Sequence, residues 1–267
     1  MTVLKTENVS ILFGGLMAVS KLNLELKEGE LVGLIGPNGA GKTTVFNMLT
    51  GVYKPTSGSI VIKSKNRQFQ SIIKLHPYQI TRLGMARTFQ NIRLFRNLSV
   101  LDNVRIANHF NAKYNTLEAI LRLPSFYKEE KRIKEDSMEL LKIFNLQHKS
   151  KELAKNLPYG EQRQLEIVRA LATKPHILLL DEPAAGMNPQ ETQELMDLIR
   201  SIIRSIKEQF KLTILLIEHD MNLVMGICQR IIVLDYGRVI AQGAPAEISK
   251  NQMVIKAYLG KEMENDA

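Results

Sequence analysis

The stretch GPNGAGKTT, residues 36–44, decides how this chain folds. It fits the pattern of Gly, four residues, Gly, Lys and then Ser or Thr, and it joins a predicted strand at 31–35 to a predicted helix at 43–49. Glycines let backbone amides converge on phosphate oxygens, and the start of the helix adds positive potential. The alternative, a plain glycine-rich turn, does not account for the flanking strand and helix. The stretch therefore predicts a P-loop that binds nucleotide phosphates.

The residues of the predicted P-loop have different tasks. We expect Lys42 to reach the β and γ phosphates and the Thr43 hydroxyl to ligate Mg²⁺. Thr44 is expected to add another phosphate contact. The remaining residues form the backbone cradle, namely Gly36, Pro37, Asn38, Gly39, Ala40 and Gly41.

A pair of carboxylates follows a buried apolar run later in the chain. The run 177–180 ends in Asp181 and Glu182, which places both side chains at the C-terminal edge of a predicted sheet, beside the phosphates. We expect Asp181 to hold the magnesium shell and Glu182 to polarise the attacking water. Alone, a strand followed by two acids is more often only a strand end. Together with the P-loop, the pair predicts nucleotide hydrolysis.

Strand and helix patterns alternate along the rest of the chain. The first 60 or so residues are predicted to be mainly sheet, and 77–173 is predicted to be a helical second lobe. Strands alternating with helices imply an α/β fold with a parallel sheet covered on both faces. Further strands are predicted at 59–63, 177–180, 213–217 and 231–234, and helices at 77–83, from Ser99, at 129–144 and from Asn188-Pro189.

Composition and charge limit the class of protein. The chain has 267 residues and 45% hydrophobic content, which can form a real core, and its single cysteine, Cys228, excludes an internal disulfide framework. No apolar run approaches the ~20 residues that span a bilayer, so we expect a cytosolic or peripherally attached protein. The formal charge is +9, and the segment 60–105 carries +8 of it. Such a basic segment suits phosphates, an anionic membrane or nucleic acid, or is only a solvated surface.

The segment LPYGEQRQLEIVRAL, residues 157–171, resembles the signature motif of ABC ATPases, and it lies just upstream of the Asp181-Glu182 strand as in that family. Other motifs agree in order: Phe13 upstream of the P-loop, Gln90 in RTFQN, AGMNP at 185–189 and His219 in IEHD. The resemblance implies a P-loop NTPase fold with a RecA-like parallel-sheet core, an antiparallel β subdomain and an α-helical subdomain. It divides the chain into core at 1–90, helical subdomain at 91–174, core again at 175–243 and a helical tail at 244–267.

The same resemblance implies the ligand and the remaining site residues. The family binds ATP between two units that close head to tail, so Tyr159, Gly160 and Glu161 are expected to complete the site of a partner. Phe13 is expected to stack on adenine. Catalytic roles fall to Glu182, His219 and Gln90, and the metal ligands are expected to be Thr43, Gln90 and Asp181. Without the family, Phe13 would be a core residue, Gln90 a surface amide and His219 a histidine at a strand end.

Two positions depart from the family's commonest pattern. Pro158 stands where a serine hydroxyl usually reaches the γ-phosphate, and proline has neither a hydroxyl nor an N–H. Gly160 and the start of the following helix can still present amides, so a weaker but working contact is expected. Asn188 stands where many relatives have aspartate, which puts the coupling between the two sites in doubt.

The stretch RTFQNIRLF at 87–95, together with DEPAAGMNP and the ending AEISKN…VIKAYLG, is similar to the LivG type of branched-chain amino-acid importers. This resemblance implies a second ABC ATPase subunit, two transmembrane permease subunits, a solute-binding protein, and a place on the cytoplasmic face of the inner membrane. The transported solute is expected to be a branched-chain or related amino acid. Alternatives are urea or amide import, lipid or lipopolysaccharide export and, more distantly, a soluble ABC ATPase acting on nucleic acid, although no nucleic-acid partner is expected.

Overall fold

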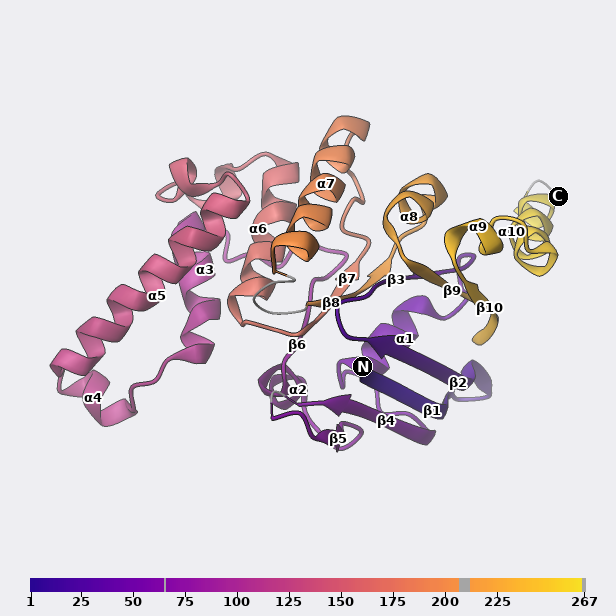
Figure 1. Cartoon of the computed structure of the whole chain (residues 1–267), viewed down its shortest axis with the longest axis horizontal. Helices are drawn as coiled ribbons and strands as arrows, with labels where there is room; N and C mark the ends of the chain where they lie inside the picture. Colours follow the sequence, from indigo (N-terminus) through magenta and orange to yellow (C-terminus); the bar gives the residue numbers. More distant parts are fainter. Residues whose placement is uncertain (65, 207–211, 266–267) are drawn as a thin grey trace. The chain divides into compact units, whose positions relative to one another are not determined.

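The computed structural model describes residues 1–64, 66–206 and 212–265, so Lys65 of the basic segment lies outside the described residues. The chain consists of two compact units (Figure 1). We call them the core unit, which comprises Met1–Arg87, His176–Pro183 and Ile199–Ala267, and the helical unit, which comprises Thr88–Pro175 and Ala184–Leu198.

A six-stranded sheet forms the centre of the core unit. Its strand order is β10-β9-β3-β8-β7-β6, and neighbours run parallel except for the antiparallel pair β9 and β10. Every residue of β3, β7 and β8 is buried, as expected for strands covered on both faces. The predicted parallel sheet is thus confirmed. The strands are β3 (Leu31–Ile35), β6 (Met85–Arg87), β7 (Ile177–Asp181), β8 (Thr213–Ile217), β9 (Arg230–Asp235) and β10 (Arg238–Gly243).

A second, antiparallel sheet belongs to the same unit, with the order β2-β1-β4-β5. Helix α1 (Lys42–Leu49) lies between the two sheets (Figure 1), and its Phe46 is fully buried in one hydrophobic core with Leu24 of β2 and Leu215 of β8. This shared core fixes the start of α1, and with it the P-loop, against both sheets. The strands are β1 (Thr2–Phe13), β2 (Leu16–Lys27), β4 (Ser57–Lys63) and β5 (Phe69–Ser71).

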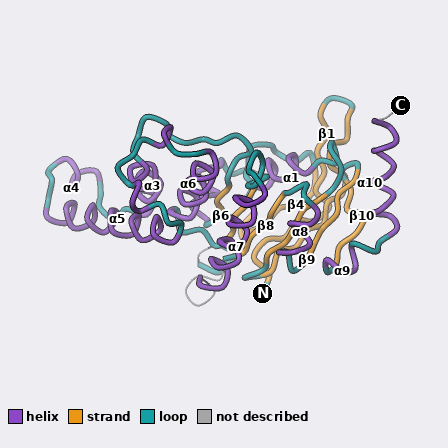
Figure 2. Tube along the Cα trace, turned by 90° about the horizontal axis from the view of Figure 1, so that it is seen from above, coloured by secondary structure: helices purple, strands orange, loops and turns teal. Residues whose placement is uncertain are grey.

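The core unit also contains the end of α7 (Pro189–Ile206) and the helices α2 (Pro77–Leu83), α8 (Met221–Ile227), α9 (Pro245–Ile248) and α10 (Gln252–Asn265). Figure 2 shows α10 alongside β10, which it contacts. Cys228 directly follows α8 and is buried, and a Cβ added to Gly33 would lie only 3.1 Å from its sulfur. Burial raises the pKa of the Cys228 thiol to about 12.

The helical unit is built on α3, α5 and α6, which pack against one another. Ser99 begins α3 as predicted, because its hydroxyl accepts a hydrogen bond from the Asp102 amide at 3.0 Å. The helices are α3 (Val100–Asn108), α4 (Thr116–Ile120), α5 (Pro124–Ile143), α6 (Tyr159–Ala172) and the first part of α7 (Pro189–Ile206), with 3₁₀ turns at His109–Asn111, Gln147–Lys149 and Ala154–Asn156.

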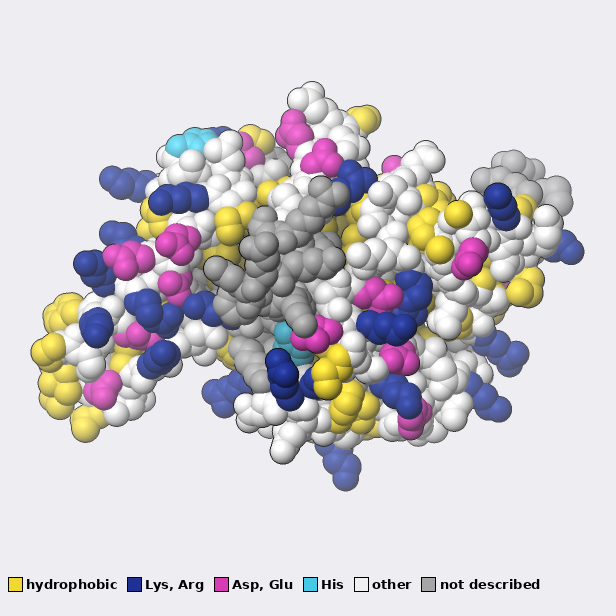
Figure 3. Space-filling view, in the orientation of Figure 1, with side chains coloured by type: hydrophobic (Ala, Val, Ile, Leu, Met, Phe, Trp, Pro, Cys, Tyr) yellow, Lys and Arg dark blue, Asp and Glu magenta, His cyan; other side chains and the backbone are white. Residues whose placement is uncertain are grey.

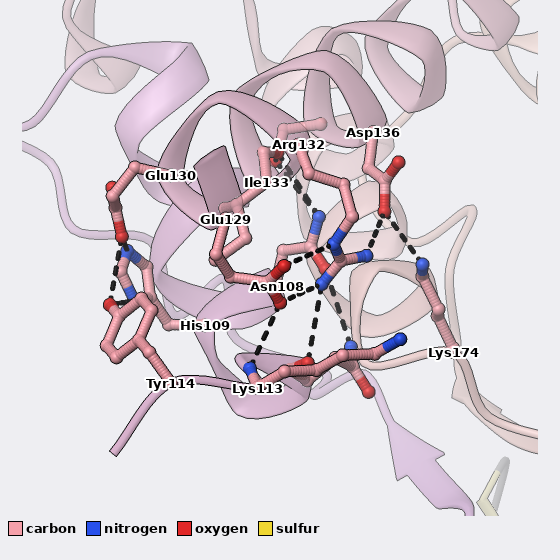
Figure 4. Close-up of polar contacts among 12 residues, drawn as sticks. Asn108, His109, Lys113, Tyr114, Glu129, Glu130, Arg132, Ile133, Asp136 and Lys174 are labelled. Atoms are coloured by element: carbon pink, nitrogen blue, oxygen red, sulfur yellow. Dashed lines mark hydrogen bonds and ion pairs between the residues drawn. The ribbon is translucent and has the colours of Figure 1, made fainter. Parts of the chain in front are cut away.

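A polar network ties the loop after α3 to α5 (Figure 4). The Arg132 guanidinium bonds Glu129 at 2.6 Å and Asp136 at 2.9 Å, and it also donates to the Asn111 carbonyl oxygen. The bond to Arg132 lowers the pKa of Glu129. Since Lys174 bonds Asp136 as well, at 2.7 Å, the acids of α5 are largely neutralised by basic partners within the unit.

Apolar and charged side chains share the surface of the helical unit. Leu117 and Ile120 of α4 are 63% and 72% exposed, and Figure 3 shows hydrophobic side chains gathered over this helix, next to the basic and acidic ones of α5. Within the described residues, no helix has the length and hydropathy needed to cross a bilayer.

Candidate active site

Two glycines of the P-loop are required by backbone conformation and by close packing. After β3 ends at Ile35, Gly36 has a φ of +151°, and a Cβ there would lie 2.0 Å from the Leu234 carbonyl oxygen. Gly41 caps α1 with a φ of +101°, and its Cβ would lie 2.8 Å from the Ala18 carbonyl oxygen. A side chain at either position would therefore displace the loop.

The polar groups of the P-loop gather at the start of α1. Lys42 is buried, and its ammonium donates to the carbonyl oxygens of Gly36 at 2.6 Å and Pro37 at 3.0 Å. Thr43 is exposed and Thr44 is half-buried. The first turn of α1 contains no acidic residue, so the positive potential of the helix start is not cancelled locally. The loop thus offers an ammonium, a hydroxyl and helix amides to an anion.

Three neighbouring strands bring Asp181, Glu182 and His219 to the edge of the sheet that carries the P-loop. β3 leads into the P-loop, β7 ends at Asp181, and β8 ends at Ile217, which lies opposite Asp181 in the register. Glu182 follows β7, and His219 lies two residues beyond β8. The His219 side chain is 64% exposed, and its Nδ1 lies 3.8 Å from the buried carboxylate of Glu218. These strand ends carry the predicted phosphate, metal and catalytic groups.

Glu182 has an unusual backbone conformation. Its φ is +47°, in the left-handed region that residues other than glycine rarely occupy and that costs about 1–3 kcal/mol. A hydrogen bond of 2.9 Å from its N–H to the Ile217 carbonyl oxygen holds it there. Strain of this kind concentrates at functional positions. The catalytic role of Glu182 stays a prediction.

Arg87 is a neighbour of Asp181 that the sequence pattern did not reveal. Its guanidinium lies 2.6 Å from the Asp181 carboxylate, with the two side chains 7% and 4% exposed. It also donates to the Asn47 side chain at 2.6 Å and to the Thr50 hydroxyl at 3.3 Å, both in or next to α1. From the sequence, Arg87 was only one member of the basic segment. In the structure it links the helix that begins at the P-loop to the carboxylate at the end of β7.

The donors at this edge fit Mg²⁺. Asp181 supplies a carboxylate and Thr43 a hydroxyl, which are the hard oxygen ligands that Mg²⁺ prefers. Over the described parts of the chain, no group of three or more His, Cys, Asp or Glu residues could hold a metal ion. Mg²⁺ is usually bound by one or two protein oxygens together with substrate phosphates.

Phe13 stands at the end of β1 with a second aromatic residue beside it. Its side chain is 43% exposed, so Phe13 is not a core residue, which was the interpretation expected without the family resemblance. The ring of Tyr53 meets it edge-on, with the centroids 5.2 Å apart. Sequence reasoning missed Tyr53, although an aromatic residue four positions after α1 was a possible signal. The pair leaves a partly exposed aromatic face on the core unit.

The candidate signature residues open α6 in the helical unit. Pro158 is the N-cap of this helix and makes no side-chain capping bond. Tyr159 is 43% exposed, and a Cβ on Gly160 would lie 2.9 Å from the Glu191 carboxylate. Glu161 is bound through both carboxylate oxygens by the Lys149 ammonium, at 2.6 and 2.7 Å. Lys149 was not anticipated, and it neutralises an acid where a phosphate is expected.

Gln90 also belongs to the helical unit, because the boundary with the core unit falls between Arg87 and Thr88. Its side chain is exposed. The structure thus groups Gln90 with the signature residues in one compact unit, and the P-loop with Asp181, Glu182 and His219 in the other. The role of Gln90 as a metal ligand stays a prediction, and so do the roles of the other candidate residues.

Asn188 begins α7, as the sequence predicted. Its side-chain oxygen accepts from the Glu191 amide at 2.9 Å, while the Asn188 N–H donates to the Glu191 carboxylate at 3.0 Å. This reciprocal pair is a capping box. An asparagine serves as well as an aspartate here, because both are strong N-cap residues. The departure from the commoner aspartate therefore preserves the start of the helix.

Comparison with known proteins assigns this arrangement to a family. Residues 19–185 match the family model described as ABC transporter, which is more than half of the chain. The chain belongs to the ABC transporter family. Residues 238–264 also match the model described as branched-chain amino acid ATP-binding cassette transporter.

Individual members of the ABC family agree along nearly the whole chain. The chain is 46% identical to the high-affinity branched-chain amino acid transport ATP-binding protein LivG of Salmonella typhimurium, over 97% of this chain and 98% of the relative. Its fold is similar to the crystal structure of the ADP conformation of MJ1267, an ATP-binding cassette of an ABC transporter (TM-score 0.81, 26% identity, 97% and 99% of the chains covered). It is also similar to the dimeric structure of MJ0796, a bacterial ABC transporter cassette (TM-score 0.73, 26% identity, 91% and 98% covered).

Membership in the ABC family confirms the predicted fold class, a P-loop NTPase core with antiparallel β and helical parts. The chain is an ATP-binding subunit of an ABC transporter, and its ATPase activity is coupled to transport. In this family, importer ATPases work as dimers with transmembrane permease subunits.

The N-cap position of Pro158, next to the candidate signature residues, supports a prediction for Pro158→Ser. Serine is a preferred N-cap, and its hydroxyl can accept from an amide of the first turn of α6, where Pro158 makes no such bond. We expect ATPase activity to be kept or raised, and the free energy of unfolding to increase by up to about 1 kcal/mol. Steady-state ATPase assays and chemical denaturation measure the two effects. Collapse of the ATPase rate would show that the proline has a role of its own.

Proposed function

We propose that this chain hydrolyses ATP to drive the uptake of branched-chain or related amino acids through a membrane importer. The observation that carries the proposal is the match of residues 238–264 to the branched-chain amino acid cassette model, because the match at 19–185 concerns ABC transporters in general. The 46% identity with LivG over nearly the whole chain supports the same solute class.

In the proposed reaction, the core unit holds ATP and prepares the attacking water. Lys42 and Thr44 bind phosphate oxygens, and the exposed Phe13 ring stacks on adenine. Thr43, Asp181 and, from the helical unit, Gln90 are the proposed ligands of Mg²⁺, which neutralises phosphate charge when bound.

Glu182 is the proposed general base for the attacking water, because its carboxylate directly follows β7 at the sheet edge that carries the P-loop. His219, exposed at the same sheet edge, is proposed to donate to the γ-phosphate. Gln90 is proposed to respond to the nucleotide or metal bound in the site and to transmit this response to the permease subunits.

A second cassette is proposed to complete the site. Tyr159, Gly160 and Glu161 would face the ATP of the partner, where the amides at the start of α6 attract the γ-phosphate. Lys149 removes the charge conflict between Glu161 and that phosphate. We propose a pairing with a second, related ABC ATPase, attachment to two permease subunits at the cytoplasmic face of the inner membrane, and delivery of solute by a solute-binding protein.

The proposal is tested by reconstitution. The chain is co-expressed with a second cassette, the two permeases and the solute-binding protein, and the purified complex is placed in lipid vesicles. ATP-dependent accumulation of labelled leucine, abolished by omitting the binding protein, is the expected result. Accumulation of urea or short amides without leucine, or release of lipid without uptake, would replace the proposed solute class.

The loop that carries Gln90 also carries two exposed arginines, Arg93 and Arg96, from the basic segment. We expect alanine at both positions to weaken assembly with the permeases, because the positive loop is proposed to face the membrane subunits and anionic headgroups. Arg82→Ala, an exposed arginine of the same segment on α2, is the matched control and should assemble normally. Pull-down of the permeases and ATPase assays measure the effect. Unchanged assembly and ATPase activity in the double variant would refute this role.

A further inference from the structure

Arg163, one turn into α6, joins the loop of Gln90 to the first residue of the signature helix. Its guanidinium donates to the carbonyl oxygens of Phe89 at 3.0 Å and Gln90 at 2.5 Å. It also donates to the Tyr159 hydroxyl, at 3.1 Å from Nε and 2.8 Å from Nη2. The side chain is only 4% exposed. One buried group therefore holds both the loop and Tyr159.

Glu166, the next residue on the same face of α6, holds the loop by its amides. Its carboxylate accepts from the N–H of Phe89 at 3.3 Å and of Arg93 at 3.4 Å, and it lies 3.7 Å from Arg163. Arg169, one turn further along, donates to the Arg93 carbonyl oxygen. Burial raises the pKa of Glu166, while the loop amides oppose that rise. The backbone from Phe89 to Arg93 is thus bound to α6 at five points.

We propose that Arg163 is a positioning residue that makes the Gln90 loop and the signature motif move as one body. A movement of the signature motif, caused when Tyr159 contacts the nucleotide of a second cassette, would then also move the loop that faces the permeases. This transmission would not pass through the core unit. This inference rests on the proposed function, which supplies the partner at Tyr159 and the permeases at the loop. It adds the residue that connects them.

The fork geometry of arginine is what the connection needs. A guanidinium presents several N–H donors in fixed directions, whereas a lysine ammonium is a single point on a flexible stem. Arg163→Lys keeps the positive charge beside Glu166 but cannot reach two carbonyl oxygens and the Tyr159 hydroxyl at once. Arg132→Lys is the matched control, because Arg132 makes a similar set of bonds in the same unit (Figure 4) with none to the loop or to Tyr159.

The test is hydrogen exchange on the full-length chain with Mg²⁺ and a slowly hydrolysed ATP analogue. In the parent and in Arg132→Lys, the nucleotide should slow exchange at residues 157–163 and at the Phe89 and Arg93 amides together. In Arg163→Lys, protection at 157–163 should remain, while the two loop amides exchange at least about fivefold faster than in the parent. A role limited to stability would speed exchange throughout the helical unit, and would overturn the inference.

Two further results are decisive. Equal nucleotide-dependent protection of the loop in Arg163→Lys and in the parent would show that the loop does not depend on Arg163. Lack of protection around Tyr159 in the parent would overturn the shared nucleotide site itself, and this inference with it. The two failures are distinguishable, because the first leaves the protection at 157–163 intact.

Discussion

Glu182→Gln is expected to bind ATP as the parent does and to hydrolyse it about a thousandfold more slowly. The amide has nearly the same shape as the carboxylate, so the left-handed backbone at residue 182 and its hydrogen bond to Ile217 should be kept. A neutral amide cannot take a proton from the attacking water. The substitution should therefore leave ATP binding unchanged while it slows ATP hydrolysis.

Single-turnover hydrolysis and binding of a fluorescent ATP analogue measure the two steps. If two cassettes share the nucleotide, the variant should also accumulate as an ATP-bound dimer, detectable by size-exclusion chromatography. Glu218→Gln, a buried carboxylate next to β8, is a control for the loss of a negative charge at the same sheet edge. Hydrolysis at the parent rate in Glu182→Gln would rule out Glu182 as the base.

Arg87→Met is expected to lower the free energy of unfolding by about 3–5 kcal/mol, because it leaves the buried Asp181 carboxylate without its cation. The side chains of the pair are 7% and 4% exposed, so water would hydrate the remaining carboxylate poorly. The bonds from Arg87 to Asn47 and Thr50 are lost as well. Methionine keeps much of the side-chain volume, which limits the effect of a cavity.

A double-mutant cycle with Asp181→Asn isolates the ion pair in this prediction. The double variant should be less destabilised than the sum of the single variants, because both charges of the ion pair are then removed together. Arg105→Met is the exposed comparison: Arg105 pairs with Asp102 and Glu130 but is 31% exposed, and its loss should cost at most about 1 kcal/mol. Equal destabilisation in the two arginine variants would mean that burial of the Arg87 pair has no energetic consequence.

Local patterns in the sequence were sufficient to predict the elements that carry the P-loop and the carboxylates. The runs at 31–35, 177–180 and 213–217 became fully buried parallel strands because β-branched and leucine side chains suit a sheet covered on both faces. Ser99 and Asn188 were identified as helix starts from their capping chemistry, which acts within three residues. The long strand β1 has no clear alternating pattern in the sequence, because its polar and apolar residues alternate irregularly around several register shifts.

Contacts between distant residues were not predictable from the sequence. Arg87 appeared as one cation in a basic segment, yet it is buried against Asp181, 94 positions away. Arg163 lay within a recognised motif, but its bonds to Phe89 and Gln90 span more than 70 positions. Such pairings depend on which strands become neighbours and how a helix is rotated, and local patterns in the sequence reveal neither. Tyr53 was missed for the same reason.

The buried Cys228 makes the chain convenient for site-specific labelling. It is the only cysteine in the sequence. With its pKa raised to about 12, the thiol is scarcely ionised at neutral pH, so maleimide reagents should not react with it. A cysteine placed at an exposed position such as 117 on α4, and another on α10, could then carry spin labels without removing a native thiol. Distances between the two units could be followed through the ATP cycle in an otherwise unaltered protein.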